Sequence, residues 1–342
     1  GAVAEAVRLG IAEAARNRWC ACTGDIVSAF LRAPVPAGTR LALRPPMALI
    51  KAGLAEQEEV WVVQTALYGF RSSPRWWSTH RTMKMKDAVT KGGLVCQQGQ
   101  ADADVWQIKA ADGTTTGLMV VYVDDFLIMG PKHVCDDTYE WMASTWESTP
   151  CQYATPTTSV RFLGMEITQK LNDNGEVEAY ALAQEGYVEE ILRQHGIGFP
   201  AGHTPDELRT AQSLTGELAW LAQRCRPDLS YTVSIMGSLT TRDPARVATI
   251  GRKALCYLNH TKEWKLEFRT GGAPHLVTYT DSSYAPEGGK SHAGSVVFWA
   301  GSPVAWKSGR QSLVTTSSAE TELLAASDGA TLTYSIDAML SD

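Results

Sequence analysis

The sequence lacks the features that define membrane proteins, disulfide-rich secreted domains and zinc sites. Its longest apolar stretch, residues 117–130, is interrupted by two aspartates, and no run is long enough to span a bilayer. The seven cysteines are scattered, with no Cys-x-x-Cys pair and no Cys/His cluster at zinc spacing. An odd number of dispersed thiols is typical of reduced cysteines in an intracellular protein. No signal peptide is apparent.

An excess of basic residues is missing too. The chain has 31 Lys and Arg against 37 Asp and Glu, a formal net charge of −6. Enzymes that act on nucleic acids usually carry a basic surplus, so this balance counts against such a function, although a basic groove can coexist with an acidic exterior. The composition is otherwise that of a globular protein, and 342 residues suffice for two or three domains.

Hydrophobic periodicity and turn residues predict an α+β body, a helical middle and a second, smaller α/β unit. Helices are expected over residues 2–16, 74–89, 132–147, 187–194, 211–223, 229–239 and 244–259, and from residue 318. Strands are expected over residues 22–27, 41–43, 59–63, 104–109, 116–123, 126–129, 160–168, 276–280, 295–299 and 304–307, and after the turn at 172–175. The clearest linker is 271–274. The chain starts without Met inside a helical pattern and stops in another, so we expect a segment of a longer polyprotein.

Two adjacent carboxylates interrupt the longest apolar stretch. Residues 118–121 and 126–129 are apolar at nearly every position, which predicts strands covered on both faces. Asp124 and Asp125 form the turn between them. Two ionised carboxylates are costly to leave unpaired there, and Mg²⁺, which commonly uses one or two carboxylates, would relieve the cost. A solvated hairpin turn, in which Asp-Asp only shapes the turn, fits the same residues.

A third carboxylate favours the metal site. Asp25 ends a predicted short strand and precedes an apolar run. Placed beside the hairpin pair, it could share two metal ions with them. Two ions would activate a primer 3′-hydroxyl, stabilise the pentacovalent phosphorus and neutralise the leaving pyrophosphate. The protein then contributes mainly positioning and electrostatics.

Four motifs stand in the order and spacing of copia-type retrotransposon reverse transcriptases. They are Asp25-Ile-Val-Ser-Ala-Phe30-Leu, Ala66-Leu-Tyr-Gly-Phe-Arg-Ser-Ser-Pro-Arg75, Tyr122-Val-Asp-Asp125 and Phe162-Leu-Gly-Met-Glu-Ile167. The similarity continues through Arg226-Pro-Asp-Leu-Ser230 into the last segment. The chain thus resembles a copia-type (Pseudoviridae-like) LTR retrotransposon Pol polyprotein, covering the reverse transcriptase and the start of its ribonuclease H domain.

The resemblance implies a right-hand polymerase fold and its usual ligands. It places a palm with truncated fingers at residues 1–168, a thumb and helical connection at 169–272, and a partial ribonuclease H-like α/β domain, truncated at its carboxyl end, at 273–342. Expected ligands are two Mg²⁺ per active site (Mn²⁺ as a substitute), dNTPs, an RNA template and a DNA/RNA primer–template duplex. Expected partners are the integrase and protease segments of Pol, in a cytoplasmic virus-like particle or the nucleus, without membrane contact.

Individual roles follow by position in the motifs. Asp25, Asp124 and Asp125 match the catalytic, metal-binding carboxylates. Phe30 falls where the family has an aromatic steric gate that collides with a ribose 2′-hydroxyl; the alternative is a core phenylalanine.

The second and fourth motifs imply contacts to the nucleotide and the primer. Tyr68, Gly69 and Arg71 lie in the loop under the template base and incoming nucleotide, where glycine permits close approach. Phe162, Leu163 and Gly164 resemble the primer grip; the alternative is a buried strand. Basic and aromatic residues follow the loop, as on nucleic-acid surfaces, or as a solvated helix face with buried tryptophans: Arg75, Trp76, Trp77, Arg81, Lys84 and Lys86.

The last segment resembles a ribonuclease H domain. Asp281 ends a predicted strand and Glu322 enters a helix, matching the first two of the four carboxylates that hold two metals in such domains. Glu320 is explained by the helix dipole alone. The resemblance places the third and fourth carboxylates beyond residue 342, so we expect no ribonuclease H activity from this chain alone.

The polymerase also looks incomplete by the same comparison. Most of the fingers segment that precedes the first motif in the family, with its basic triphosphate ligands, is missing; Arg8 is the nearest basic candidate, and we do not assign it. Weak or absent activity is therefore expected from the chain itself. Two alternative functions are a catalytically silent nucleic-acid-binding remnant and a metal-dependent nuclease. The intact carboxylates give no sign of decay, and the four polymerase motifs speak against the nuclease.

Overall fold

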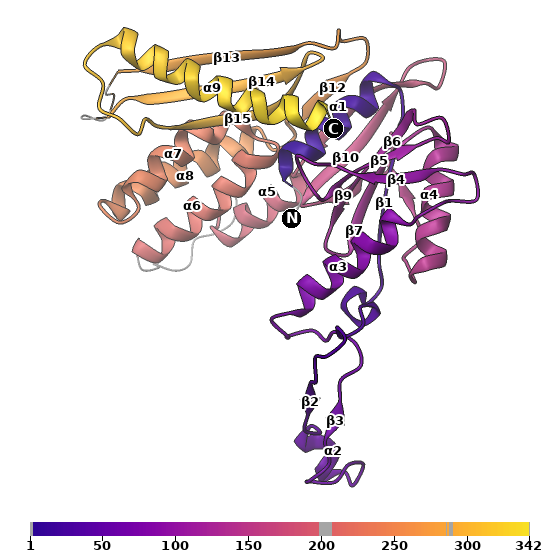
Figure 1. Cartoon of the computed structure of the whole chain (residues 1–342). Helices are drawn as coiled ribbons and strands as arrows, with labels where there is room; N and C mark the ends of the chain where they lie inside the picture. The colour runs from indigo at the N-terminus through magenta and orange to yellow at the C-terminus, as the bar shows by residue number, and fades with distance from the viewer. Residues whose placement is uncertain (1–2, 198–206, 285, 287–289, 342) are drawn as a thin grey trace.

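A six-stranded antiparallel sheet forms the centre of the molecule (Figure 1). The structure is a computed structural model that describes residues 3–197, 207–284, 286 and 290–341. The strand order is β4-β5-β6-β7-β1-β8. The strands are β1 (Cys20–Asp25), β4 (Val95–Gln98), β5 (Val105–Lys109), β6 (Thr115–Tyr122), β7 (Asp125–Gly130) and β8 (Gln152–Tyr153).

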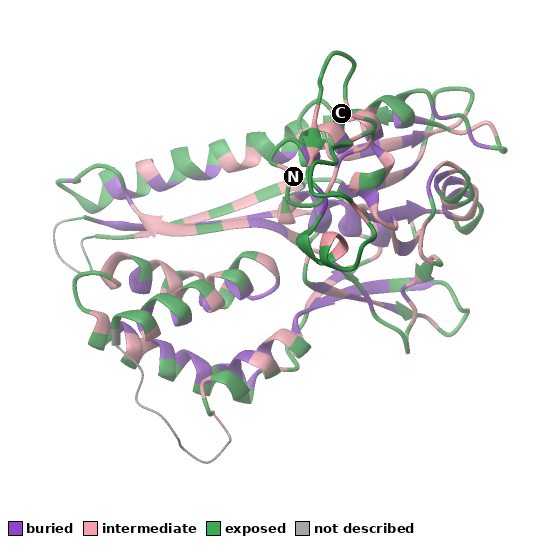
Figure 2. Ribbon diagram, turned by 90° about the horizontal axis from the view of Figure 1, so that it is seen from below, coloured by how far each residue is buried: buried purple, intermediate pink, exposed green. Residues whose placement is uncertain are grey.

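Both faces of this sheet are covered, as the apolar runs predicted. Met119 and Val121 of β6 point into one core with α3 (Ser73–Lys86) and α4 (Lys132–Thr145). Leu118 and Val120 point into the other, with α1 (Ala4–Arg16). Alternate side chains of a strand face opposite sides, so an apolar residue at every position is what two covered faces require. Figure 2 shows these strands buried and the outer face of the last helix exposed.

An arm projects from the body between β1 and α3 (Figure 1). It comprises η1 (Ala29–Arg32), β2 (Ala42–Leu43), α2 (Met47–Lys51) and β3 (Trp61–Val62). β2 and β3 pair within it, an isolated bridge joins Pro34 to Thr65, and α2 has no buried residue. The helix was not predicted, because its five residues are too few to show a helical period.

A second antiparallel sheet has the order β12-β11-β10-β9. Its strands are β9 (Val160–Phe162), β10 (Met165–Leu171), β11 (Val177–Ala183) and β12 (Leu266–Arg269). The single strand expected over residues 160–168 is wrong: Leu163 and Gly164 turn the chain with positive φ (50° and 75°), which makes a hairpin. The predicted boundary at residue 168 falls inside β10, so this sheet continues across it; the division into units stays a prediction.

The chain between β11 and β12 forms a helical layer, as predicted. It consists of α5 (Glu185–Gln194), α6 (Glu207–Arg224), the short η2 (Pro227–Leu229), α7 (Ser230–Leu239) and α8 (Pro244–His260), which share one apolar core. The last unit is a three-stranded sheet, β13 (Leu276–Ser283), β14 (His292–Trp299) and β15 (Ser302–Arg310), with α9 (Ser318–Ser341) across one face. Within the described residues, no helix is long and apolar enough to cross a membrane. All seven cysteines are free thiols.

Arg8 joins three parts of the fold. Its side chain is fully buried. Its Nε donates to the carbonyl of Val304 (2.7 Å), and its Nη1 to those of Gln223 (2.7 Å) and Arg224 (3.1 Å). Glu5 supplies the countercharge at 3.2 Å. Arg8 is therefore excluded as a triphosphate ligand, because its side chain is fully buried and its Nε and Nη1 donate to carbonyls inside the protein.

Candidate active site

The three predicted carboxylates lie on neighbouring strands at one end of the central sheet. The β6–β7 hairpin turns at Val123 and Asp124, and Tyr122 pairs with Asp125. Asp25, at the end of β1, is the antiparallel partner of Asp125. The amide of Ile26 donates to the carbonyl of Asp124 over 2.9 Å, which ties the two segments together. The fold thus brings together residues that are about a hundred positions apart in the sequence.

The carboxylates repel one another. Burial raises the pKa of Asp125 to about 6, with further contributions from the charges of Asp124 and Asp25. Burial and the charge of Asp124 also raise the pKa of Asp25. Oxygen ligands from carboxylates are what Mg²⁺ prefers, and a cation would relieve this repulsion. In the part of the chain that is described, however, no group of three or more His, Cys, Asp or Glu side chains is arranged so that it could hold a metal ion.

A cleft of about 380 Å³ opens beside the carboxylates. Asp25 and Asp125 line it together with Phe162 of β9 and with Arg161, whose side chain is 74% exposed. Thr149 closes one side; its Oγ1 accepts from the amide of Asp25 at 2.9 Å. The cleft therefore holds two acidic groups and an exposed cationic side chain, paired with Glu166 over 3.2 Å, between the central sheet and the β9–β10 hairpin.

Two of the predicted nucleotide-binding residues touch each other. The rings of Phe30 in η1 and Tyr68 have centroids 4.9 Å apart. Phe30 is half-buried against the core, whereas Tyr68 is 57% exposed. Gly69 follows with φ of 90°, which favours glycine, and open space lies where a Cβ would be. Arg71 is exposed. These positions form one surface, and their ligands stay a prediction.

The basic and aromatic residues of α3 divide between two faces. Trp77 and Arg81 are buried, at 1% and 2% exposure, and face the β6–β7 turn. Arg75, Lys84 and Lys86 are exposed. Trp77 therefore matches the alternative, in which tryptophan is buried beneath a solvated helix face. Contact with nucleic acid stays a prediction only for the exposed cations.

The raised pKa of Asp125 predicts a loss of stability with rising pH in the metal-free protein. An unfolded aspartate titrates near 3.9, whereas folded Asp125 titrates near 6. The folded state then binds the proton more tightly, so the free energy of unfolding is highest below about pH 4 and falls until about pH 6. Because Asp125 is only partly desolvated and still reaches solvent, screening limits the effect to ~1 kcal/mol.

Asp125→Asn should flatten this decline. Urea unfolding with EDTA at pH 4.5 and pH 7.5 measures it, with Asp337→Asn on exposed α9 as the control. The electrostatic reading is contradicted if the pH dependence of Asp125→Asn equals that of the wild type.

Comparison with known proteins decides the family. A family model described as reverse transcriptase (RNA-dependent DNA polymerase) matches residues 2–204. The chain belongs to this reverse transcriptase family. The match includes all three carboxylates and the β9–β10 hairpin.

Relatives of this chain include transposon proteins. It is 26% identical over 289 residues to the putative transposon Ty5-1 protein of Saccharomyces cerevisiae, covering 79% of this chain and 88% of that protein. It is 32% identical over 119 residues to secreted RxLR effector protein 161 of Plasmopara viticola, 34% of this chain and 83% of the relative. It is 23% identical over 341 residues to the retrovirus-related Pol polyprotein from transposon RE1 of Arabidopsis thaliana, 92% of this chain but 21% of that polyprotein. The copia-type Pol resemblance is thereby confirmed; the start of a ribonuclease H domain stays a prediction.

The hairpin predicted as the primer grip is fixed from α6. The chain turns at Leu163 and Gly164, and Arg224 Nε donates to the Leu163 carbonyl over 2.9 Å. Trp220 packs against Gly164 so closely that an added Cβ would lie 3.1 Å from the ring. Phe162 itself is buried, as the strand alternative requires.

The two carboxylates predicted for a ribonuclease H site lie on different faces. Thr278, Thr280 and Ser282 of β13 contact α9. Because strand side chains alternate, Asp281 points away from α9. Glu322, on α9, is exposed. The sequence could not predict this arrangement, because it does not say which face of β13 packs against α9.

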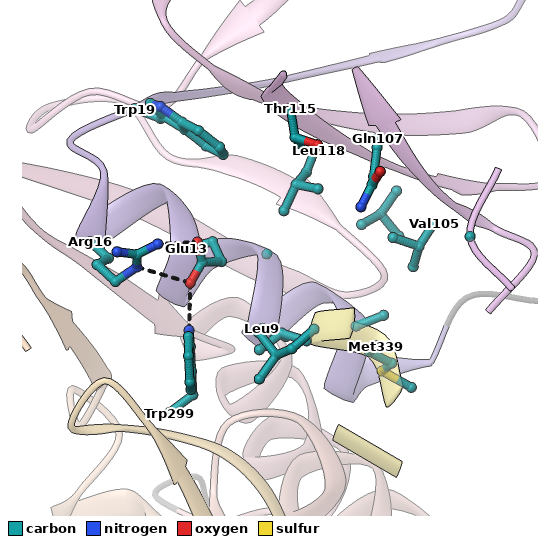
Figure 3. Close-up of a pocket in the computed structure, with 15 residues that line it drawn as sticks. Leu9, Glu13, Arg16, Trp19, Val105, Gln107, Thr115, Leu118, Trp299 and Met339 are labelled. Atoms are coloured by element: carbon teal, nitrogen blue, oxygen red, sulfur yellow. Dashed lines mark hydrogen bonds and ion pairs between the residues drawn. The ribbon is translucent and has the colours of Figure 1, made fainter. Parts of the chain in front are cut away.

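A separate cavity of about 290 Å³ lies on the opposite face of the central sheet from α3 (Figure 3). It is mostly apolar, between α1, the sheet and the last unit. Glu13 of α1 accepts a hydrogen bond from Trp299 Nε1 (2.5 Å) and forms an ion pair with Arg16 (3.1 Å). The motifs gave no sign of this cavity, and it contains none of the predicted site residues.

Proposed function

We propose that the chain is a fragment of an RNA-directed DNA polymerase that joins dNTPs to a primer 3′-hydroxyl by two-metal nucleotidyl transfer. One observation carries the proposal: Asp25 pairs with Asp125 across β1 and β7, with Asp124 in the adjoining turn. Three carboxylates from two separate segments at one sheet end are the donor set for hard cations bridging to phosphates.

Asp25, Asp124 and Asp125 would hold Mg²⁺, or Mn²⁺ in its place. The ions would supply an activated 3′-hydroxyl and charge neutralisation at the phosphates. The raised pKa values of Asp25 and Asp125 favour this role, because a cation would restore the ionised forms. The carboxylates thus bind and orient, and the rest of the cleft positions the ends of the reacting strands.

The cleft beside the carboxylates is the proposed place of the primer terminus. Arg161 is exposed there and could follow a phosphate, while Leu163 and Gly164 would support the primer backbone. Tyr68, Gly69 and Arg71 would face the nucleotide and template base. An RNA template and a primer–template duplex are the proposed macromolecular ligands. Integrase and protease segments of Pol are the proposed partners, in a cytoplasmic virus-like particle or the nucleus.

Primer extension tests the proposal. A version of the chain that carries the family's fingers segment ahead of residue 1 should extend oligo-dT on poly-rA with dTTP and Mg²⁺. We expect no extension without template or with EDTA. A well-folded extended version that is inert under all conditions would favour the catalytically silent nucleic-acid-binding remnant. The chain alone should give weak or no extension.

Phe30→Val should raise ribonucleotide use. The Phe30 ring packs against Tyr68, and removing the Phe30 ring opens space for a 2′-hydroxyl. We expect the ratio of kcat/KM for UTP to that for dTTP to increase about 10–100-fold. The matched control is Phe298→Val, since Phe298 is a half-buried phenylalanine that also packs on a tyrosine, with ring centroids 5.8 Å apart. If Phe30→Val left the sugar selectivity unchanged, the steric-gate role would be contradicted and Phe30 would be a core phenylalanine.

A further inference from the structure

The β6–β7 turn has a backbone conformation that its sequence does not favour. Val123 adopts φ of 54°, in the left-handed region. This region is strongly disfavoured for a β-branched side chain, so something outside the turn must hold it there. The next residue is Asp124, which makes the conformation of Val123 decide where that carboxylate lies.

Two side chains of α3 hold the Val123 carbonyl. Trp77 Nε1 donates to it over 2.6 Å and Arg81 Nη1 over 3.0 Å. The two residues are four positions apart, so they project from one face of the helix. Both are almost fully buried. A carbonyl that accepts from two buried side chains, one of them charged, is fixed more firmly than a turn requires for its own closure.

Arg81 is itself held in place. Its Nη2 forms an ion pair with Asp104 Oδ1 at 2.7 Å, just before β5. The backbone carbonyl of Asp104 accepts from the amide of Val121 at 2.9 Å, next to the turn along β6. Burial lowers the pKa of Arg81 and Asp104 raises it again. The helix, the β5 end and the turn are thus linked in one closed set of contacts.

We propose that Trp77 and Arg81 are positioning residues that hold Val123 in its left-handed conformation and thereby set the carboxylates of Asp124 and Asp125. The inference rests on the proposed polymerase function for its catalytic consequence. Neither side chain touches the cleft; both act through the Val123 carbonyl. Ordinary core packing is the competing explanation, and it predicts no link to metal binding.

The test uses Trp77→Phe, which keeps an aromatic ring and removes the Nε1 donor. Trp146→Phe is the matched control, because Trp146 is buried (4% exposed) and packs edge-on against Trp77, with ring centroids 5.5 Å apart. Arg81→Lys keeps the charge near Asp104 but loses the planar donor geometry. The free Mn²⁺ signal in electron paramagnetic resonance gives the metal affinity of the chain itself. Amide hydrogen exchange of the 122–126 segment gives the order of the turn.

We expect Trp77→Phe and Arg81→Lys to weaken Mn²⁺ binding about tenfold and to speed exchange in the turn, with Trp146→Phe unchanged in both. In the version of the chain that carries the fingers segment, we expect kcat of both variants to fall while KM for dTTP stays unchanged. Equal behaviour of Trp77→Phe and Trp146→Phe in exchange and Mn²⁺ affinity would overturn the proposal. If the wild type and Asp124→Asn bind Mn²⁺ equally well, the proposed metal site is contradicted, and with it the catalytic role of Trp77 and Arg81. Faster amide exchange in Trp77→Phe and Arg81→Lys would then show only that the two side chains hold the turn.

Discussion

Asp124→Asn should lower primer extension about 10³-fold or more. Metal ions contribute several kcal/mol of charge stabilisation in phosphoryl transfer, and each 1.36 kcal/mol is a factor of ten. Asparagine keeps the size of the side chain but removes the charge and one strong oxygen ligand. Asp124 lies in an exposed turn with its backbone tied to Ile26, so the fold should survive. The measurement is the single-turnover rate of dTTP addition on poly-rA with Mg²⁺.

Asp112→Asn is the control for Asp124→Asn. Asp112 also lies in a hairpin turn of the central sheet, between β5 and β6, where its Oδ1 accepts from the amide of Thr114 at 2.9 Å. We expect its rate to equal the wild type. A harmless Asp124→Asn, or an equal loss in both variants, would remove Asp124 from the chemistry.

Arg8→Met should destabilise the protein by ~3–5 kcal/mol. The change leaves the carbonyls of Val304, Gln223 and Arg224 without their shared donor, and it leaves Glu5 without its countercharge. Unsatisfied buried groups are more costly than the net value of the bonds they lose. Because these carbonyls come from α6 and β15, the loss should also loosen the last unit from α1. Urea unfolding followed by tryptophan fluorescence measures the change.

Arg16→Met controls for the loss of a positive charge on the same helix. Arg16 is about one-third exposed and pairs with Glu13 on α1 itself. We expect it to cost less than ~1 kcal/mol. Equal free energies of unfolding for the two variants would show that the buried Arg8 contacts do not hold the parts together.

The sequence predicts the carboxylate site better than it predicts what supports it. Apolar residues at nearly every position of 118–121 and 126–129 indicated two covered faces, and the motif order linked Asp25 to the hairpin. The contact of Trp77 with Val123 has no local signal, because the two residues are 46 positions apart and meet only when α3 packs on the sheet. The same reason applies to Arg8, whose carbonyl partners lie more than 200 positions away.

The β9–β10 hairpin shows where periodicity is insufficient. Residues 160–168 are mostly apolar, as in one buried strand, and Leu163 is not a turn residue. Its left-handed conformation is sustained by Arg224 from α6, a tertiary contact that overrides local preference. β12 was missed for a similar reason: its four residues pair with β11 across the whole helical layer. Short strands of this kind are defined by their partners and not by their own sequence.

A double-substitution cycle tests the central claim, that Asp25 and Asp124 form one catalytic site. The measurement is the single-turnover rate of dTTP addition by the extended version for wild type, Asp25→Asn, Asp124→Asn and the pair. Groups that act as a unit are strongly non-additive. We predict that either single change lowers the rate about as much as both together. Losses that multiply, or an Asp25→Asn variant with the wild-type rate, would contradict the account.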